Sequence, residues 1–237
     1  MKNKKTSLII VCSLVIMAFF FSLPVIVLKS SDAISDGKIY TSDIKTIEFG
    51  KKIDTESLIY LIINGIRVET PESEMHLKAD KLRDTLKNSL SPYYESGLIV
   101  EDFDDYSISN YWSYRVYSDS DSSVSGAYWV VDMQTASFPK NYLFLSIDDE
   151  TGEILFITYV TEESTYDVAD LETYHEKLVE TYSEAVGIKF DDYYDEGSFY
   201  NRNTKQYYIE TAYGRFCLNF YLTDYGFNVT PGIDTYE

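Results

Sequence analysis

The sequence predicts an α+β fold: an N-terminal transmembrane helix, then two small units that each pack one helix on an antiparallel sheet. Three observations lead to this expectation. An uncharged apolar run lies close to the N-terminus, two apolar stripes with helical spacing follow, and strand-like runs separated by turn residues come after each stripe. The predicted parts are a cytoplasmic tail, a transmembrane helix, a stalk and two α+β units, at residues 1–7, 8–28, 29–52, 53–161 and 162–237.

The run Leu8–Leu28 contains 21 residues without a charge. As a helix rising about 1.5 Å per residue it spans about 31 Å, which matches the hydrocarbon thickness of a bilayer. Lys2, Lys4 and Lys5 precede the run, so the positive-inside rule places the N-terminus in the cytoplasm. The alternative is a cleaved signal peptide, whose apolar region usually has about 7–15 residues. We expect a single-pass anchor in the cell membrane, with the C-terminal domain outside the cell.

The chain beyond the predicted span is strongly acidic. It has 39 acidic and 20 basic residues, no acid precedes Asp32, and four of the lysines lie at or before Lys29. The remainder therefore carries a net charge of 16 − 39 = −23. This charge repels nucleic acid and anionic lipid, so we expect no nucleic-acid partner. Cys217 is the only cysteine outside the span, a usage that fits a Gram-positive cell envelope.

Residues 54–68 allow two interpretations. Asn64-Gly65 between apolar runs is typical of a hairpin turn. Alternatively, Asp54 caps a short helix that ends at Gly65, and we favour this helix.

Two longer helices are predicted from apolar stripes. Thr70 caps the first, Pro71 suits its first position, and Ser91-Pro92 ends it. Asp167 caps the second, and Gly187 ends it. The stripes consist of Met75, Ala79, Leu82, Leu86 and Leu90 in the first helix, and Leu171, Tyr174, Leu178, Tyr182 and Ala185 in the second. Strand-like runs follow at 111–117, 126–133, 142–147 and 154–160 in the first unit, and at 205–213, 215–223 and 227–230 in the second.

The hairpin at 142–160 has four acids at its tip. A three-residue loop of Glu150, Thr151 and Gly152, with Gly152 in the left-handed conformation, places Asp149 opposite Glu153. That register also pairs Ile147 with Leu155, Leu145 with Ile157 and Leu143 with Tyr159, which makes one wholly apolar face. We therefore interpret the acids as the solvated tip of a turn and not as a metal site.

The opposite face of this hairpin carries Tyr142, Phe144, Ile154, Phe156 and Val160. It is too apolar to remain in water, so something must cover it. The candidates are the segment 54–64, the second unit or a protein partner. In the second unit a Tyr213-Gly214 turn pairs Ile209 with Leu218 on the core face. It pairs Glu210 with Cys217 on the opposite face, which is polar.

A strand followed by Ile147-Asp-Asp-Glu-Thr-Gly-Glu-Ile-Leu155 and a second strand resembles the D-x-x-T-G-x-I hairpin of PepSY-like extracytoplasmic domains. The resemblance covers fewer than twenty residues and the order of helix before sheet. It implies small helix-plus-sheet modules on membrane-anchored or secreted bacterial proteins, which are implicated in regulating peptidases and in envelope signalling. The second unit lacks the signature, and no functional residue is carried over.

The sequence lacks the motifs of common catalytic sites. His175-Glu176 begins a zinc-protease helix motif, but Val179 stands where the second histidine is needed. We therefore expect no enzyme and no catalytic, cofactor or metal residues, and we expect a binding or regulatory module that docks to another envelope protein.

The alternative function is an envelope-ligand binder. Calcium could bind acidic loops, although none has the order of EF-hand ligands. Wall glycan could stack on some of the 23 tyrosines, although tyrosine also fills half-buried sheet positions. The candidate groups are Asp102/Asp104/Asp105, Asp119/Asp121, Asp148/Asp149/Glu150 and Asp191/Asp192/Asp195/Glu196 for calcium, and Tyr93-Tyr94, Tyr111-Trp112 and Tyr193-Tyr194 for glycan.

Overall fold

The computed structural model describes residues 53–190, 193–194 and 203–232. All of them belong to the compact unit Glu48–Glu237. The predicted tail, membrane span and stalk, 1–52, lie outside the described residues. Within the described ranges, no helix has the length and apolar character needed to cross a membrane.

The described residues form one antiparallel sheet of nine strands in the order β1-β2-β3-β4-β5-β9-β8-β7-β6. The first five strands are consecutive neighbours, so the chain builds one half of the sheet as a meander. The strands are β1 (Ile66–Glu69), β2 (Tyr106–Tyr117), β3 (Ser125–Thr135), β4 (Tyr142–Asp148), β5 (Ile154–Val160), β6 (Tyr193–Tyr194), β7 (Thr204–Thr211), β8 (Gly214–Thr223) and β9 (Gly226–Pro231).

The α+β class and the antiparallel pairing are as predicted, but the two predicted units, 53–161 and 162–237, do not have separate sheets. The last strand, β9, lies between β5 and β8 and pairs with both. Ile157 of β5 is opposite Val229, and Phe220 of β8 is opposite the same residue. The sequence analysis missed this pairing because strand periodicity does not identify a strand's neighbours.

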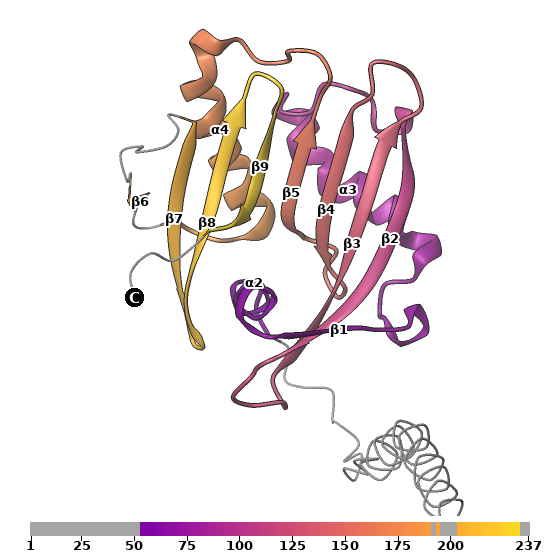
Figure 1. The fold of residues 1–237 in the computed structure, drawn as a ribbon, viewed down its shortest axis with the longest axis vertical. Coiled ribbons are helices and arrows are strands. Elements are labelled where there is room, and N and C mark those ends of the chain that lie inside the picture. Colours follow the sequence, from indigo (N-terminus) through magenta and orange to yellow (C-terminus); the bar gives the residue numbers. More distant parts are fainter. Residues whose placement is uncertain (1–52, 191–192, 195–202, 233–237) are drawn as a thin grey trace, which may run out of the picture. The chain divides into compact units, whose positions relative to one another are not determined.

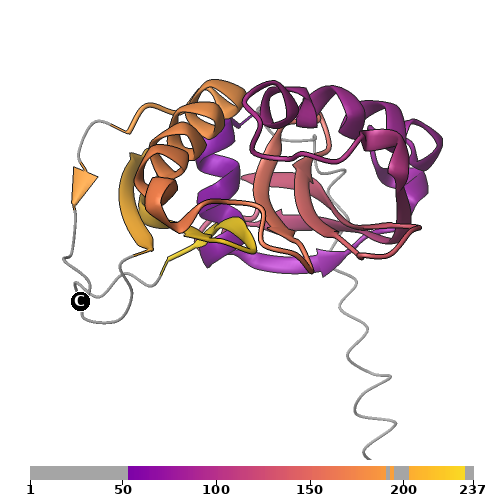
Figure 2. The same ribbon diagram turned by 90° about the horizontal axis from the view of Figure 1, so that it is seen from above.

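Three α-helices are described: α2 (Thr55–Asn64), α3 (Leu82–Glu95) and α4 (Leu171–Val186). The helices α3 and α4 lie side by side over one face of the sheet (Figures 1 and 2). The helix α2 lies at one end of the sheet, where it contacts β2 and β3 on one side and β7 and β8 on the other (Figure 1). Figure 1 looks onto the sheet face opposite α3 and α4, which we call the open face.

The helix favoured for 54–64 is confirmed. The Asp54 side chain accepts a hydrogen bond from the Ser57 N–H at 2.8 Å, and the Gly65 N–H closes the last turn on the Leu61 carbonyl. Three apolar residues of α2 are buried, namely Leu58, Ile59 and Leu61. Because this face meets strands from both halves of the sheet, its burial favours the helix over the hairpin.

The first long helix begins and ends later than predicted. The segment before Leu82 forms only short 3₁₀ turns at Glu72–Glu74 and Ala79–Lys81, and Thr70 pairs its N–H with the Ser113 carbonyl. The helix also continues through Pro92 to Glu95. Tyr93, which is fully buried and stacked on Phe227, packs this last turn onto the sheet. Tertiary packing thus overrides the local stop signal.

The second long helix, α4, ends at Gly187 as predicted, with a φ of 70° in the left-handed region. Asp167 caps the 3₁₀ turn Val168–Asp170 that leads into α4, and it accepts a hydrogen bond from the Ala169 N–H. The Tyr182 hydroxyl donates to the Leu155 carbonyl at 2.7 Å, which fixes α4 on β5.

The β7–β8 hairpin has the predicted faces but a different register. Thr211 is opposite Gly214, Ile209 is opposite Phe216, and Cys217 is opposite Tyr208 and not Glu210. The loop is therefore Ala212-Tyr213, and every pair is shifted by two positions. A shift of two keeps each side chain on its face, so the apolar pattern cannot detect it.

Candidate functional site

The open face combines a buried end with an exposed apolar patch. Its side chains alternate with those that pack under α3 and α4, such as Leu143 and Leu145. We define the open-face patch by its four exposed residues, which come from β2, β4 and β5. They are Trp112, Tyr142, Phe144 and Val160, with 37, 43, 47 and 44% of their surface exposed.

The structure divides the predicted partner face into two parts. Tyr142, Phe144 and Val160 are exposed. Phe156 is on the open face and is 7% exposed, whereas the bulge places Ile154, which is 1% exposed, opposite Ile147 of the face under α3 and α4, so this part of the prediction is wrong. Of the predicted covers, the segment 54–64 reaches the hairpin tip, where the Thr55 hydroxyl donates to a Glu153 carboxylate oxygen at 2.8 Å, and the remaining patch is open among the described residues.

Charged side chains are scarce on the central strands of this face. On the four central strands β3, β4, β5 and β9, the open-face positions that the structure describes carry only Asp132 and Asp148 as charged residues. Asp148 is buried at the hairpin tip, whereas Asp132 is half-buried beside the patch. In a chain with 39 acids, this scarcity is a feature of the central strands, since the outer strand β1 places Arg67 and Glu69 on the same face.

Asp132 lies opposite Phe144 on β4 and opposite Asn110 on β2. Its Oδ1 atom is buried and has no hydrogen-bond partner among the described residues. Burial raises the pKa of the Asp132 carboxyl, and a hydrogen bond from Asn110 acts in the opposite direction. The carboxylate is therefore only partly satisfied by its surroundings.

The predicted solvated tip at 148–153 is wrong for its first two acids. Asp148 and Asp149 are 8 and 5% exposed. Asp148 binds within the turn, accepting from the Glu150 N–H at 3.0 Å and the Thr151 hydroxyl at 2.8 Å. Asp149 accepts from distant residues: the Trp129 indole at 2.8 Å and the N–H groups of His76 and Leu77 at 2.7 and 3.0 Å.

The turn itself is docked against the helices. Gly152 has the predicted left-handed φ, +76°, but a Cβ there would lie 2.5 Å from the Thr85 side chain of α3. The Ser89 hydroxyl of α3 donates to the Gly152 carbonyl at 2.7 Å. A bulge after Ser146 pairs Ile147 with Ile154 instead of Leu155. The carboxylates of this tip therefore hold segments of the chain together.

A hollow of about 300 Å³ lies beside this turn. Its lining includes Asp149 and Glu150 from the turn, Glu74 and His76 from the segment before α3, and Arg115 from β2. His76 is exposed, as predicted, although it is not on a helix.

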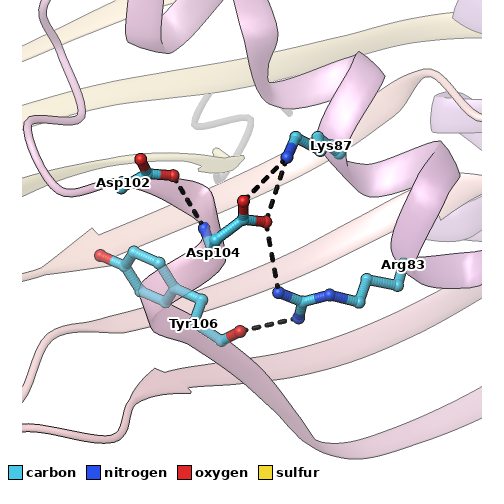
Figure 3. A network of polar contacts seen from close by, with 5 residues as sticks. All are labelled: Arg83, Lys87, Asp102, Asp104 and Tyr106. Carbon is cyan, nitrogen blue, oxygen red and sulfur yellow. Dashed lines mark hydrogen bonds and ion pairs between the residues drawn. The ribbon is translucent and has the colours of Figure 1, made fainter.

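The acidic loops proposed for calcium do not gather three or more candidate ligands anywhere in the described ranges. Asp104 instead receives the Lys87 ammonium at 3.0 and 3.2 Å and lies 3.8 Å from the Arg83 guanidinium (Figure 3). Asp102 accepts the Asp104 N–H. Asp121 accepts hydrogen bonds from the N–H and the hydroxyl of Ser123, and these bonds lower the pKa of the Asp121 carboxyl. The fourth candidate, 191–196, has no described side chain.

The aromatic pairs proposed for glycan binding do not form one platform in the described residues. Tyr93 is in the core, and Tyr94 packs edge-on against Phe103. Tyr111 packs against Trp129 on the opposite face and is 40% exposed, whereas Trp112 is on the open face. The side chains of 193–194 lie outside the description.

His175 on α4 is 3% exposed, and its Nε2 lies 3.0 Å from the Phe220 carbonyl oxygen. Because a carbonyl can only accept, Nε2 carries the proton, and Nδ1 has no partner among the described residues. Burial lowers the pKa of His175. This histidine fixes α4 on β8.

A half-buried carboxylate, Glu101, was not identified from the sequence. Glu101 accepts from the hydroxyls of Tyr106 at 3.0 Å and Tyr159 at 2.7 Å, and from the Asn141 amide. Burial raises the pKa of both tyrosines, and Glu101 raises them further. No local motif identifies this cluster, because its members come from four separate segments of the chain.

No protein-family model, curated protein or solved structure matches this chain. The resemblance to PepSY-like domains therefore rests on the residues of the hairpin alone.

Proposed function

We propose that this chain is a non-catalytic binding module that docks to another protein of the cell envelope through the open-face patch. The observation that supports this proposal is a group of exposed aromatic and aliphatic side chains on a face whose central strands carry only two charged residues. Interface cores are depleted in charge and enriched in aromatic residues.

The partner in this proposal has a basic surface around the contact. Residues beyond Lys29 carry a net charge of −23, so two copies of this chain repel each other, whereas a basic rim attracts it. The predicted anchor Leu8–Leu28 supports a position at the outer surface of the membrane. A module tethered there meets proteins of the same envelope without leaving the membrane.

Photocrosslinking in intact cells tests the proposal. The full-length chain carries p-benzoylphenylalanine in place of Tyr142, and the crosslinked protein is identified and purified for direct affinity measurement. The paired change Phe144→Ser and Val160→Ser should weaken that affinity at least tenfold, because it removes two exposed anchors. Raising the salt from about 50 to 300 mM should weaken it further.

Phe138→Ser is the matched control, since Phe138 is 83% exposed in the β3–β4 loop and lies outside the patch. Its affinity should equal that of the unchanged chain. The proposal is wrong if Phe138→Ser weakens the affinity as much as the paired change does. It is also wrong if the melting temperature of the paired variant falls by more than about 10 °C, because the patch is then covered by the chain itself.

A further inference from the structure

We propose that Asp132, together with Trp112 and Phe144, forms a subsite for a lysine or arginine side chain of the docked protein. The inference rests on the proposed function and adds to it the chemical group that the open-face patch recognises.

The register of three strands places these side chains together. Asp132 of β3 is directly opposite Phe144 of β4. Trp112 of β2 is opposite Val130, two residues from Asp132 on the same face. Directly opposite side chains have Cβ atoms roughly 5 Å apart, and diagonal neighbours lie roughly 7–8 Å apart. A carboxylate thus sits between two partly exposed aromatic rings.

This combination suits a cation. An ammonium or guanidinium group is attracted by the faces of aromatic rings and by the carboxylate at once. Asp132 has no ion-pair partner among the described residues, and its Oδ1 lacks a donor. The carboxylate therefore carries a negative charge that no cation among the described residues pairs with.

The same features disfavour other ligands. An anion would be repelled by Asp132 and by the net charge of the chain. A purely apolar group would cover the carboxylate and leave it unpaired, which is unfavourable in a dehydrated contact. A basic side chain with an aliphatic stem satisfies the carboxylate and packs its methylene groups on the rings.

A titration of the full-length protein in non-ionic detergent tests the subsite without the natural partner. The probe is a tetralysine peptide, and the reporter is 5-fluorotryptophan at the two tryptophan positions, observed by ¹⁹F NMR. Trp112 is exposed and on the face, whereas Trp129 is fully buried and serves as an internal reference. The Trp112 signal should shift saturably, and the Trp129 signal should not move.

Asp132→Asn and Asp132→Ser should each weaken the apparent affinity for tetralysine roughly tenfold or more. An unchanged melting temperature in both variants shows that this loss does not come from unfolding. Asp119→Asn removes an equal charge from an exposed loop and should leave the affinity unchanged. Equal affinity in all three variants overturns the subsite and shows only general attraction to an acidic protein.

The crosslinked partner separates this inference from the proposed function. If Phe144→Ser with Val160→Ser weakens partner binding but Asp132→Asn does not, docking stands and the subsite is wrong. If neither change affects binding, both proposals are wrong.

Discussion

The indole Nε1 of Trp129 lies 2.8 Å from Oδ1 of Asp149, and both side chains are buried. The two residues belong to β3 and to the turn after β4, and the same carboxylate also binds the backbone of His76 and Leu77. One acidic side chain therefore joins a strand, a turn and the segment that precedes α3.

Asp149→Asn should destabilise the fold. The Asp149 carboxylate accepts hydrogen bonds from three N–H groups. In asparagine an NH₂ group replaces one of the two acceptor oxygens, so at least one of these N–H groups loses its acceptor. Loss of such a bond costs about 1–3 kcal/mol, which lowers the melting temperature by several degrees in a domain of this size. Thermal unfolding followed by tryptophan fluorescence measures the change, and Asp119→Asn in an exposed loop is the control. An unchanged melting temperature would restore the interpretation of Asp149 as a solvated tip residue.

Gly152→Ala should destabilise more than Gly187→Ala. Both glycines have a positive φ, near 70°, so both changes carry the left-handed penalty of roughly 1–2 kcal/mol. Only at Gly152 does the new methyl group meet an obstacle, the Thr85 side chain at 2.5 Å, whereas nothing lies within 4 Å at Gly187. Chemical denaturation compares the two free energies of unfolding. Adding Thr85→Ser should recover part of the loss only in the Gly152 variant, and no recovery would contradict the packing explanation.

Stability should fall as the pH is lowered through the ordinary pKa of histidine, near 6.5, because of His175. Its folded pKa lies below the unfolded value, so the neutral form stabilises the fold fully above pH 6.5 and progressively less below it. Glu172, Glu176 and Lys205 are the charged groups that influence it. Melting temperatures at pH 7.5 and 5.5 should differ less in His175→Gln than in the unchanged chain. Equal differences would show that the many carboxylates alone determine the pH dependence.

Glu101 and Tyr159 should be coupled energetically. Glu101→Gln and Tyr159→Phe each remove one side of a 2.7 Å hydrogen bond, and the double variant should lose less stability than the sum of the two. A coupling of about 0.5–3 kcal/mol is expected from a double-mutant cycle on the free energy of unfolding. Tyr60→Phe with Glu101→Gln is the control pair, because Tyr60 belongs to α2 and lies against Gly214 at the β7–β8 turn. Simple additivity of the Glu101 and Tyr159 changes would contradict the cluster.

Local patterns were sufficient to predict most of the elements. The caps at Asp54 and Gly187 were read correctly because a cap depends on residues within one turn. The strands of the 142–160 hairpin and the left-handed Gly152 were also predicted correctly, because alternation and turn chemistry are local.

The errors arise where distant residues decide the structure. The segment 75–81 has helical spacing, yet the N–H groups of His76 and Leu77 bind Asp149 instead of continuing a helix. The burial of Asp149 depends on that same contact, and the single sheet depends on β9 pairing with β5. For the open-face patch, alternation predicted Tyr142, Phe144 and Val160, whereas Asp132 and Trp112 required knowledge of the neighbouring strands.

The position of β9 also affects how the chain reaches its native state. The strand that fills the middle of the sheet follows all the other described strands in the sequence, so during synthesis β5 and β8 each present an open edge to other chains until it emerges. Closing the sheet then joins residues about seventy positions apart, which slows folding relative to the local hairpins. Chains that stop before Gly226 should therefore aggregate through these two edges.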